Sequence, residues 1–158
     1  MALNQDKREY DESGKLINKQ CNVCFRMLPI NQYYSNTAQY DGHSNTCKEC
    51  ENASLSVRLK NYKRNAKNRK LDFILSKEEF QNISSQTCFY CGEFGSTSPT
   101  GEHYNGIDRV DSSLGYTLDN TVPCCSTCNR MKMDISQDDF LKQVYKIAQY
   151  SISKGAEI

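Results

Sequence analysis

The chain reads Cys88-Phe89-Tyr90-Cys91 and, further on, Cys125-Ser126-Thr127-Cys128. Each C-x-x-C turn places two thiolates on one side of a metal ion, and a second, distant turn completes a tetrahedron of four ligands. An earlier pair of such turns contains Cys21 with Cys24 and Cys47 with Cys50. Eight of the nine cysteines therefore fall into C-x-x-C pairs. This pattern predicts two closed, structural four-thiolate zinc sites.

The ninth cysteine is Cys124. Only Cys125 has C-x-x-C spacing to Cys128, so we assign Cys125 to the metal site and expect Cys124 to be a small buried thiol. Zinc has two alternatives. In the first, the cysteines are redox-active or unpaired buried thiols, and in the second they hold an iron–sulfur cluster. The colour of the purified protein separates an iron–sulfur cluster from zinc, because zinc is colourless.

The composition favours such metal sites over a large apolar core. The chain has 158 residues with 37% hydrophobic residues and a mean hydropathy of −0.75, which is enough for one domain or two small ones. Its apolar runs, such as Phe73-Ile74-Leu75, are far too short to span a membrane. The first twenty residues are polar and mixed in charge, without a signal-like apolar region. We therefore expect an intracellular, reducing compartment (cytoplasm, nucleoid or nucleus) in which the thiols can bind zinc.

The positive charge is concentrated in one segment. The net charge is only +1, yet seven basic residues and no acidic residue lie between Asn52 and Leu71. Residues 54–70 lack Gly and Pro, and their apolar residues recur at helical spacing. This pattern predicts a helix with a basic stripe that lies along a phosphate backbone, the alternative being a solvated helix face. The predicted DNA contacts, with Lys132 added, are Arg58, Lys60, Lys63, Arg64, Lys67, Arg69, Lys70 and Lys132.

Turn signals and helix caps divide the rest of the chain. Ser76-Lys77-Glu78-Glu79 fits a capping box at the start of a short helix, and Ser136 with Asp139 starts a final helix. Between them we predict strand, turn, strand and helix. The predicted parts are a flexible tail (1–19), an N-terminal zinc module (20–53), a basic connecting helix and a short helix (54–86), a strand–strand–helix core with the second zinc (87–135) and a C-terminal helix (136–158).

The chain from Cys21 to near Phe140 resembles the HNH (ββα-metal) endonucleases, and in particular a zinc-bound subgroup that has a second four-Cys module upstream and includes a restriction enzyme. After Cys88-Phe89-Tyr90-Cys91-Gly92, the resemblance rests on four further motifs in order: Gly106-Ile107-Asp108-Arg109-Val110-Asp111, Gly115-Tyr116-Thr117, Asp119-Asn120 and Cys125-Ser126-Thr127-Cys128-Asn129-Arg130-Met131-Lys132. It implies a small, zinc-stabilised α+β fold with a ββα-metal core.

The resemblance also implies an active site. Asp108 takes the place of the family's metal-binding acid, and Asn129 takes the second metal-ligand position at the helix start. Asn120 takes the place of the middle Asn, which orients the hairpin and active-site groups. Carboxylate and amide oxygens suit the family's hard Mg²⁺ or Mn²⁺ ion. The implied activity is metal-dependent hydrolysis of double-stranded DNA, site-specific as in restriction, homing or phage and viral nucleases.

Arg109 departs from most of the family, which carries the general base His at this position. A guanidinium stays protonated and cannot accept a proton, but it can bind the scissile phosphate. The base must come from elsewhere or from solvent, and His103, five residues before Asp108, completes the predicted catalytic set of Asp108, Arg109, Asn120, Asn129 and His103. His43, Tyr62 and Tyr104 are further candidates, although a surface or core side chain is the more ordinary role of each.

The resemblance implies double-stranded DNA as the partner, with a homodimer on a palindromic site as one arrangement and no membrane. The implied cofactors are two structural zinc ions per chain and one catalytic Mg²⁺ or Mn²⁺. The rival interpretation is a non-catalytic DNA- or RNA-binding zinc protein on an HNH scaffold. The presence of both Asp108 and Asn129 speaks against it, because binding alone does not need the metal pair.

Overall fold

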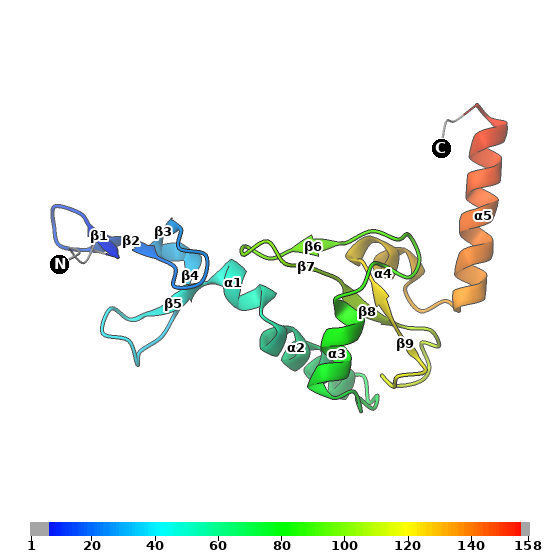
Figure 1. Ribbon diagram of the computed structural model, residues 1–158, viewed down its shortest axis with the longest axis horizontal. Coiled ribbons are helices and arrows are strands. Elements are labelled where there is room, and N and C mark those ends of the chain that lie inside the picture. The colour runs from blue at the N-terminus through cyan, green and yellow to red at the C-terminus, as the bar shows by residue number, and fades with distance from the viewer. Residues whose placement is uncertain (1–6, 156–158) are drawn as a thin grey trace. The chain divides into compact units, whose positions relative to one another are not determined.

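The computed structural model describes residues 7–155 as a small α+β chain (Figure 1). It divides into two compact units. The first contains Met1–Lys60 and Thr97–Glu102, and the second contains Asn61–Ser96 and His103–Ile158. Within the described range, every helix is too short or too polar to cross a membrane.

The first unit is built from short strands around the first cysteine set. β1 (Arg8–Tyr10), β2 (Leu16–Gln20) and β3 (Met27–Pro29) form an antiparallel sheet. A single 3₁₀ turn, η1, leads from this sheet into a second antiparallel pair that ends at a short helix. These elements are η1 (Ile30–Gln32), β4 (Tyr33–Ser35), β5 (His43–Cys47) and α1 (Lys48–Ala53).

The predicted flexible tail over residues 1–19 is wrong for the described residues, because β1 and most of β2 lie within it. The Asp11 carboxylate closes the turn between these strands by accepting from the backbone N–H groups of Ser13 and Lys15. Residues 1–6 of that prediction lie outside the described residues. Polar composition misled the prediction, since this hairpin is stabilised by hydrogen bonds and charge pairs and has little apolar burial.

A buried charge cluster fixes β2 to the loop before β5. Lys19 is only 2% exposed, and its Nζ lies 2.8 Å from Oδ2 of Asp41. Arg8 Nε lies 2.6 Å from the same oxygen. Burial opposes ionisation of Asp41, but the hydrogen bonds from Lys19 and Arg8 outweigh it and lower the pKa of Asp41 to about 2. Asp41 is therefore a charged anchor of the first unit.

The helices between the two cysteine sets form as predicted. α2 (Leu55–Asn68) begins in the first unit and buries Leu59 and Ala66 on its apolar face. α3 (Lys77–Ser84) starts at the predicted capping box, in which Ser76 Oγ accepts from the backbone N–H of Glu79 and the Glu79 carboxylate accepts from the backbone N–H of Ser76. The segment between them is an extended link with one bridge, from Phe73 to Tyr116.

The predicted strand, turn, strand and helix are also present. β8 (Gly106–Arg109) and β9 (Thr121–Cys124) form an antiparallel hairpin in which Asp108 faces Val122. The chain then enters α4 (Ser126–Lys132) directly through Cys125, which is the N-cap residue. Before the hairpin, β6 (Ser96–Thr97) and β7 (His103–Tyr104) form a small two-stranded sheet.

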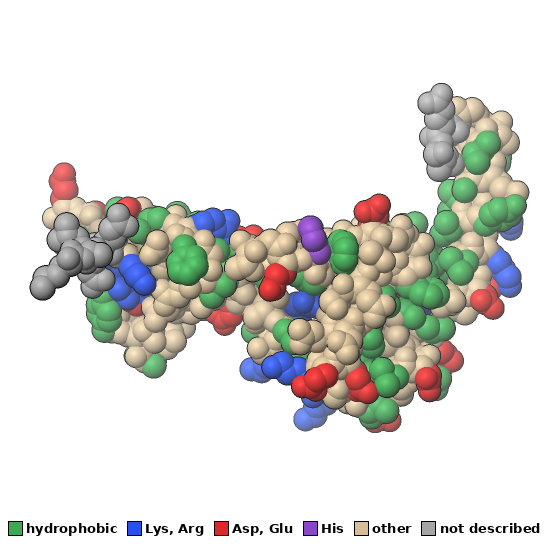
Figure 2. All heavy atoms as spheres, in the orientation of Figure 1, with side chains coloured by type: hydrophobic (Ala, Val, Ile, Leu, Met, Phe, Trp, Pro, Cys, Tyr) green, Lys and Arg blue, Asp and Glu red, His purple; other side chains and the backbone are tan. Residues whose placement is uncertain are grey.

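α5 (Gln137–Ser153) begins at the predicted cap, where Ser136 Oγ accepts from the N–H of Asp139. Phe140 is buried and packs edge-on against the ring of Tyr90 at 5.3 Å. Ile147 lies on the same helix face as Phe140, but its side chain is 53% exposed, and Figure 2 shows hydrophobic side chains along the visible face of α5. Helical periodicity identifies an apolar face without showing whether the same chain covers it.

Candidate active site and metal centres

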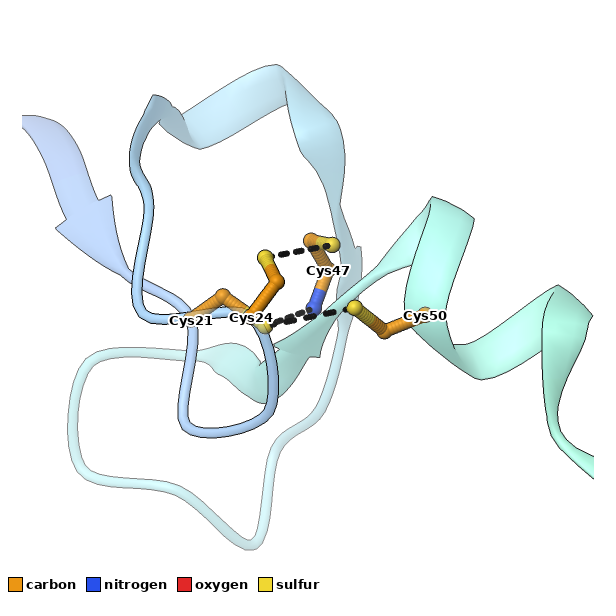
Figure 3. Close-up of side chains that lie close together, drawn as sticks. All are labelled: Cys21, Cys24, Cys47 and Cys50. Carbon is orange, nitrogen blue, oxygen red and sulfur yellow. Dashed lines mark hydrogen bonds between the residues drawn. The ribbon is translucent and has the colours of Figure 1, made fainter. Parts of the chain in front are cut away.

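Both predicted cysteine sets are assembled. In each set, the four Sγ atoms lie within 4.8 Å of one another, namely Cys21, Cys24, Cys47 and Cys50 (Figure 3) and Cys88, Cys91, Cys125 and Cys128. The Sγ atoms of Cys21 and Cys50 are 3.8 Å apart, as are those of Cys91 and Cys125. A tetrahedron with Zn–S bonds of about 2.3 Å has S–S edges of about 3.8 Å. Each set therefore has the donor chemistry and spacing of a four-thiolate metal site.

Backbone N–H groups favour the thiolate of one buried cysteine in each cluster, whereas burial raises the pKa of Cys50 and Cys128. The N–H groups of Val23 and Cys47 donate to Cys21 Sγ at 3.4 and 3.3 Å. Burial opposes ionisation of Cys21, but backbone hydrogen bonds outweigh it and lower its pKa to about 6. At Cys88, burial again raises the pKa, but backbone hydrogen bonds outweigh it and lower the pKa to about 6. Thiolate is the form that binds a metal ion.

Cys124 lies outside the second set, as predicted. It is fully buried, and its thiol donates a hydrogen bond to the carbonyl of Cys125 at 3.4 Å. Burial raises the pKa of Cys124, and the neighbouring Cys88 adds to this effect. The residue is an inert buried thiol rather than a fifth metal ligand.

The second unit contains a cavity of about 390 Å³ next to the hairpin. Asp108 and Asn129, the two predicted ligands of a hard cation, both line it. Asp108 comes from β8 and Asn129 comes from α4, directly after the last cysteine of the second set. The other lining residues are Tyr62, Asn65, Arg69, Ile107, Arg109, Tyr116, Met133 and Asp134.

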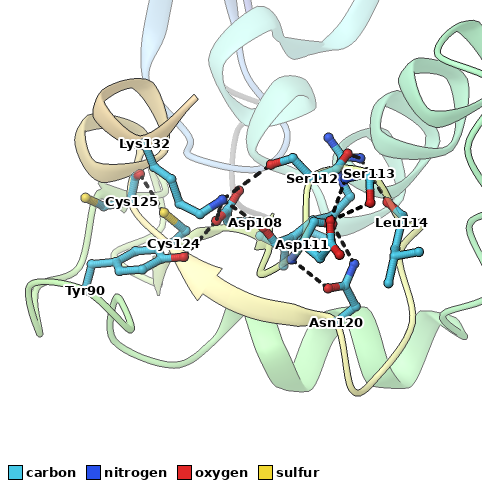
Figure 4. Close-up of polar contacts among 12 residues, drawn as sticks. Tyr90, Asp108, Asp111, Ser112, Ser113, Leu114, Asn120, Cys124, Cys125 and Lys132 are labelled. Atoms are coloured by element: carbon cyan, nitrogen blue, oxygen red, sulfur yellow. Dashed lines mark hydrogen bonds and ion pairs between the residues drawn. The ribbon is translucent and has the colours of Figure 1, made fainter. Parts of the chain in front are cut away.

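Asp108 is held from one side only. It is 6% exposed. The Tyr90 hydroxyl donates to its Oδ2 at 2.9 Å, and Lys132 Nζ lies 3.2 Å from the same oxygen (Figure 4). Burial raises the pKa of Tyr90, and the Asp108 carboxylate raises it further, so Tyr90 stays a donor. Among residues 7–155 the Oδ1 atom of Asp108 accepts no hydrogen bond, so this oxygen is available to a cation.

Lys132 was predicted to contact DNA, but its side chain lies in the interior of the second unit. Its side chain is fully buried, and Nζ donates to the carbonyl of Arg109 at 3.0 Å in addition to its ion pair with Asp108. The reason is its position on α4, four residues after the buried Cys128 and hence on the same inward face. That spacing was a sequence signal for burial.

Arg109 lines the cavity but is largely occupied by the hairpin turn. Its Nη1 donates to the carbonyls of Ser112 and Leu114, the latter at 2.9 Å, and its guanidinium lies 5.4 Å from the centre of the Tyr116 ring. Arg109 is 6% exposed. These contacts tie the guanidinium to the turn.

Asn120 closes the same turn. Its Nδ2 donates to the carbonyls of Asp111 and Gly115 at 3.0 and 2.9 Å, and its Oδ1 accepts from the N–H of Asp111 at 2.8 Å. Both the Nδ2 and the Oδ1 atoms of Asn120 therefore hold the connection between β8 and β9 (Figure 4). Asn120 itself lies outside the residues that line the cavity.

The structure does not bring the predicted base His103 to the cavity. His103 is an exposed residue of β7 that stacks on Phe94 at 5.2 Å. Neither His43 nor Tyr104 lines the cavity, whereas Tyr62 does. The Tyr62 hydroxyl accepts from the N–H of Ile107 at 3.0 Å. Gly106 permits this approach, since a Cβ there would lie 2.6 Å from the Tyr62 oxygen.

The basic side chains of the α2 segment fall into groups. Lys60, Lys63, Arg64, Lys67, Arg69 and Lys70 are exposed, while Arg58 is half-buried. Lys63, Lys67 and Lys70 line one surface depression together with Phe73, and Arg69 lines the cavity with Asp108. The sequence missed this division, and it also missed Tyr90 as a partner of Asp108, because neither contact has a local periodicity.

Comparisons with known proteins give two similar proteins. The chain is 36% identical over 100 residues, or 63% of its length, to Uncharacterized protein R423 of Acanthamoeba polyphaga mimivirus, and it spans 18% of that protein. Among solved structures it is similar to the rare-cutting HNH restriction endonuclease PacI, with 25% identity, coverage of 87% of this chain and 99% of that chain, and a TM-score of 0.45. No family model matches the chain.

Proposed function

We propose that the chain is a divalent-metal-dependent HNH endonuclease that hydrolyses phosphodiester bonds of double-stranded DNA at specific sites. The observation that carries the proposal is the meeting of Asp108 and Asn129 at one cavity, from a strand and a helix joined in ββα order. Two arginines, Arg69 and Arg109, line the same cavity. A hard-cation site with positive charge beside it suits a bound phosphodiester.

The donor set fits Mg²⁺ or Mn²⁺. Asp108 offers Oδ1, and Asn129, the fourth residue of α4, offers an amide oxygen. When bound, such an ion polarises the phosphate and stabilises the leaving 3′-oxygen. Tyr90 and Lys132 keep the other oxygen of Asp108 in place, and Asn120 holds the turn of the hairpin.

Within this proposal, Arg109 supports the turn and adds positive charge to the cavity. The attacking water needs a route for its proton. Of the four sources that the sequence suggested, Tyr62 is the one that lines the cavity, so we propose Tyr62 or bulk solvent for this step. His103 and Tyr104 of β7 and His43 of the first unit have no role in the proposed reaction.

The two cysteine clusters are proposed to hold structural zinc, since four thiolates leave no open position for chemistry. The exposed basic residues of α2 are proposed to bind the DNA backbone. A homodimer on a palindromic site is a proposed arrangement that follows from the resemblance to restriction enzymes.

The proposal is tested by incubating the protein with plasmid and genomic DNA in Mg²⁺, in Mn²⁺ and in EDTA, and by sequencing the ends. We expect cleavage with either metal, none with EDTA, and products with 5′-phosphate and 3′-hydroxyl ends. DNA binding without cleavage in both metals would favour the rival, a non-catalytic nucleic-acid-binding protein.

A further inference from the structure

Arg69 lies at the end of α2 and lines the cavity that contains Asp108 and Asn129. Backbone hydrogen bonds at the end of the helix hold the main chain of Arg69 in place. The N–H of Leu71 donates to the carbonyl of Ala66, and the N–H of Lys70 donates to the carbonyl of Lys67. Lys70 has a φ of 59°. These three features are those of a Schellman motif, in which Arg69 is the C-cap residue. The position from which its side chain projects is therefore fixed.

The guanidinium of Arg69 is not engaged elsewhere. The side chain is exposed, and within residues 7–155 it makes no ion pair with a carboxylate. Arg109, the other cation that lines the cavity, is buried and donates to two carbonyls of the hairpin turn. The turn uses Nη1 of Arg109 and leaves only its Nη2 and Nε for a phosphate, whereas the whole guanidinium fork of Arg69 is available.

Three other basic residues of the segment face a different surface. Lys63, Lys67 and Lys70 line the depression that contains Phe73, and Lys63 Nζ lies 5.8 Å from the centre of the Phe73 ring. Arg69 is absent from that depression, and these lysines are absent from the cavity. One helix end thus presents a single guanidinium to the cavity and several ammonium groups to another surface.

We propose that Arg69 binds the scissile phosphate of the DNA, the role that the sequence resemblance assigns to Arg109. A planar guanidinium can bind two phosphate oxygens at once and stabilise the charge that builds on them during hydrolysis. Lys63, Lys67 and Lys70 contact flanking phosphates and contribute to affinity. This inference rests on the proposed nuclease function and names a further catalytic residue for it.

The test compares Arg69→Ala with a matched control, Lys142→Ala, which removes one exposed positive charge from the same unit, on α5. The cleavage rate is measured on plasmid DNA with enzyme in excess and Mg²⁺ present, and DNA affinity is measured separately in EDTA. Arg69→Ala should slow cleavage by about 10²-fold or more, with a change in affinity of less than about threefold. Lys142→Ala should bind and cleave DNA as the wild type does.

A third variant, Arg69→Lys, keeps the charge and loses the planar fork. It should recover only part of the lost cleavage rate, because an ammonium group cannot bind two phosphate oxygens in the fixed geometry of a guanidinium. Zinc content and thermal unfolding, measured for every variant, report whether the fold is intact. Wild-type cleavage by Arg69→Ala, or a defect confined to affinity, would overturn the role of Arg69 alone. A wild-type protein that never cleaves would overturn the proposed function and this inference together.

Discussion

The hydroxyl of Tyr90 donates a hydrogen bond of 2.9 Å to Oδ2 of Asp108. Tyr90 lies between Cys88 and Cys91, inside a turn of the second cysteine cluster. The other partner of Asp108, Lys132, lies at the end of α4, the helix that carries Cys128. Both contacts therefore come from segments that the cluster holds, so a metal ion there would position the carboxylate without touching it.

Tyr90→Phe removes the hydroxyl that holds Asp108 and keeps the ring that packs on Phe140. We expect cleavage to fall by roughly 10- to 100-fold, because a hydrogen bond to a charged group contributes about 1.5–3 kcal/mol. DNA affinity and zinc content should be unchanged. Tyr40→Phe, at an 81% exposed tyrosine of the first unit, is the matched control. Equal cleavage rates for the two variants would remove Tyr90 from the account.

Cys88→Ser should remove the metal ion of the second cluster. Metal analysis should find about two zinc ions per wild-type chain and about one in this variant, since each four-thiolate set binds one ion. Cleavage should be lost because Tyr90 and Lys132 no longer hold Asp108. Chelation of both ions should unfold the protein. A folded wild-type protein with one zinc or none would contradict the two-site assignment.

Asp41→Asn should destabilise the first unit. The substitution leaves Lys19, 2% exposed, without its carboxylate partner, and breaking a buried ion pair costs about 3–5 kcal/mol. Chemical denaturation at neutral pH, with a signal that reports on the first unit, measures the change in its free energy of unfolding. Glu12→Gln serves as the control, because Glu12 is an exposed acidic residue of the same unit. Similar unfolding midpoints for both variants would show that the charge cluster is not an anchor.

Neutralising Lys60, Lys63, Arg64 and Lys67 together should weaken DNA binding and flatten its salt dependence. All four side chains are exposed on α2. The slope of log affinity against log salt should change by up to about 4 if each side chain contacts one phosphate. Titrations at several salt concentrations measure it, and an unaltered slope would return this stripe to a solvated helix face.

The sequence predicted features that depend on local spacing. The four C-x-x-C turns, the capping box at Ser76 and the order of β8, β9 and α4 are all present. Features that depend on what a side chain meets were missed. Lys132 became a buried partner of Asp108, and Arg109 turned to the carbonyls of its own hairpin. Charge and residue type alone do not report such tertiary contacts.

The same distinction between local spacing and tertiary contact explains what the sequence predicted at the β1–β2 hairpin and at α5. The hairpin of β1 and β2 is stabilised by Asp11 and by the charge cluster of Arg8, Lys19 and Asp41, and apolar periodicity does not detect such contacts. At α5, periodicity was present, but only the start of the apolar face, at Phe140, is buried.

Asn129→Ala tests the catalytic metal site most directly. Asp108→Ala is less clean, because it leaves Lys132 buried without its ion pair, whereas Asn129 is only half-buried. Cleavage of plasmid and genomic DNA is measured for wild type and Asn129→Ala over a Mg²⁺ titration, with DNA affinity and zinc content measured in parallel. We predict Mg²⁺-dependent cleavage by the wild type and none by Asn129→Ala at any Mg²⁺ concentration, with affinity and zinc content unchanged. Cleavage by Asn129→Ala at the wild-type rate and with the wild-type Mg²⁺ dependence would contradict the proposed site.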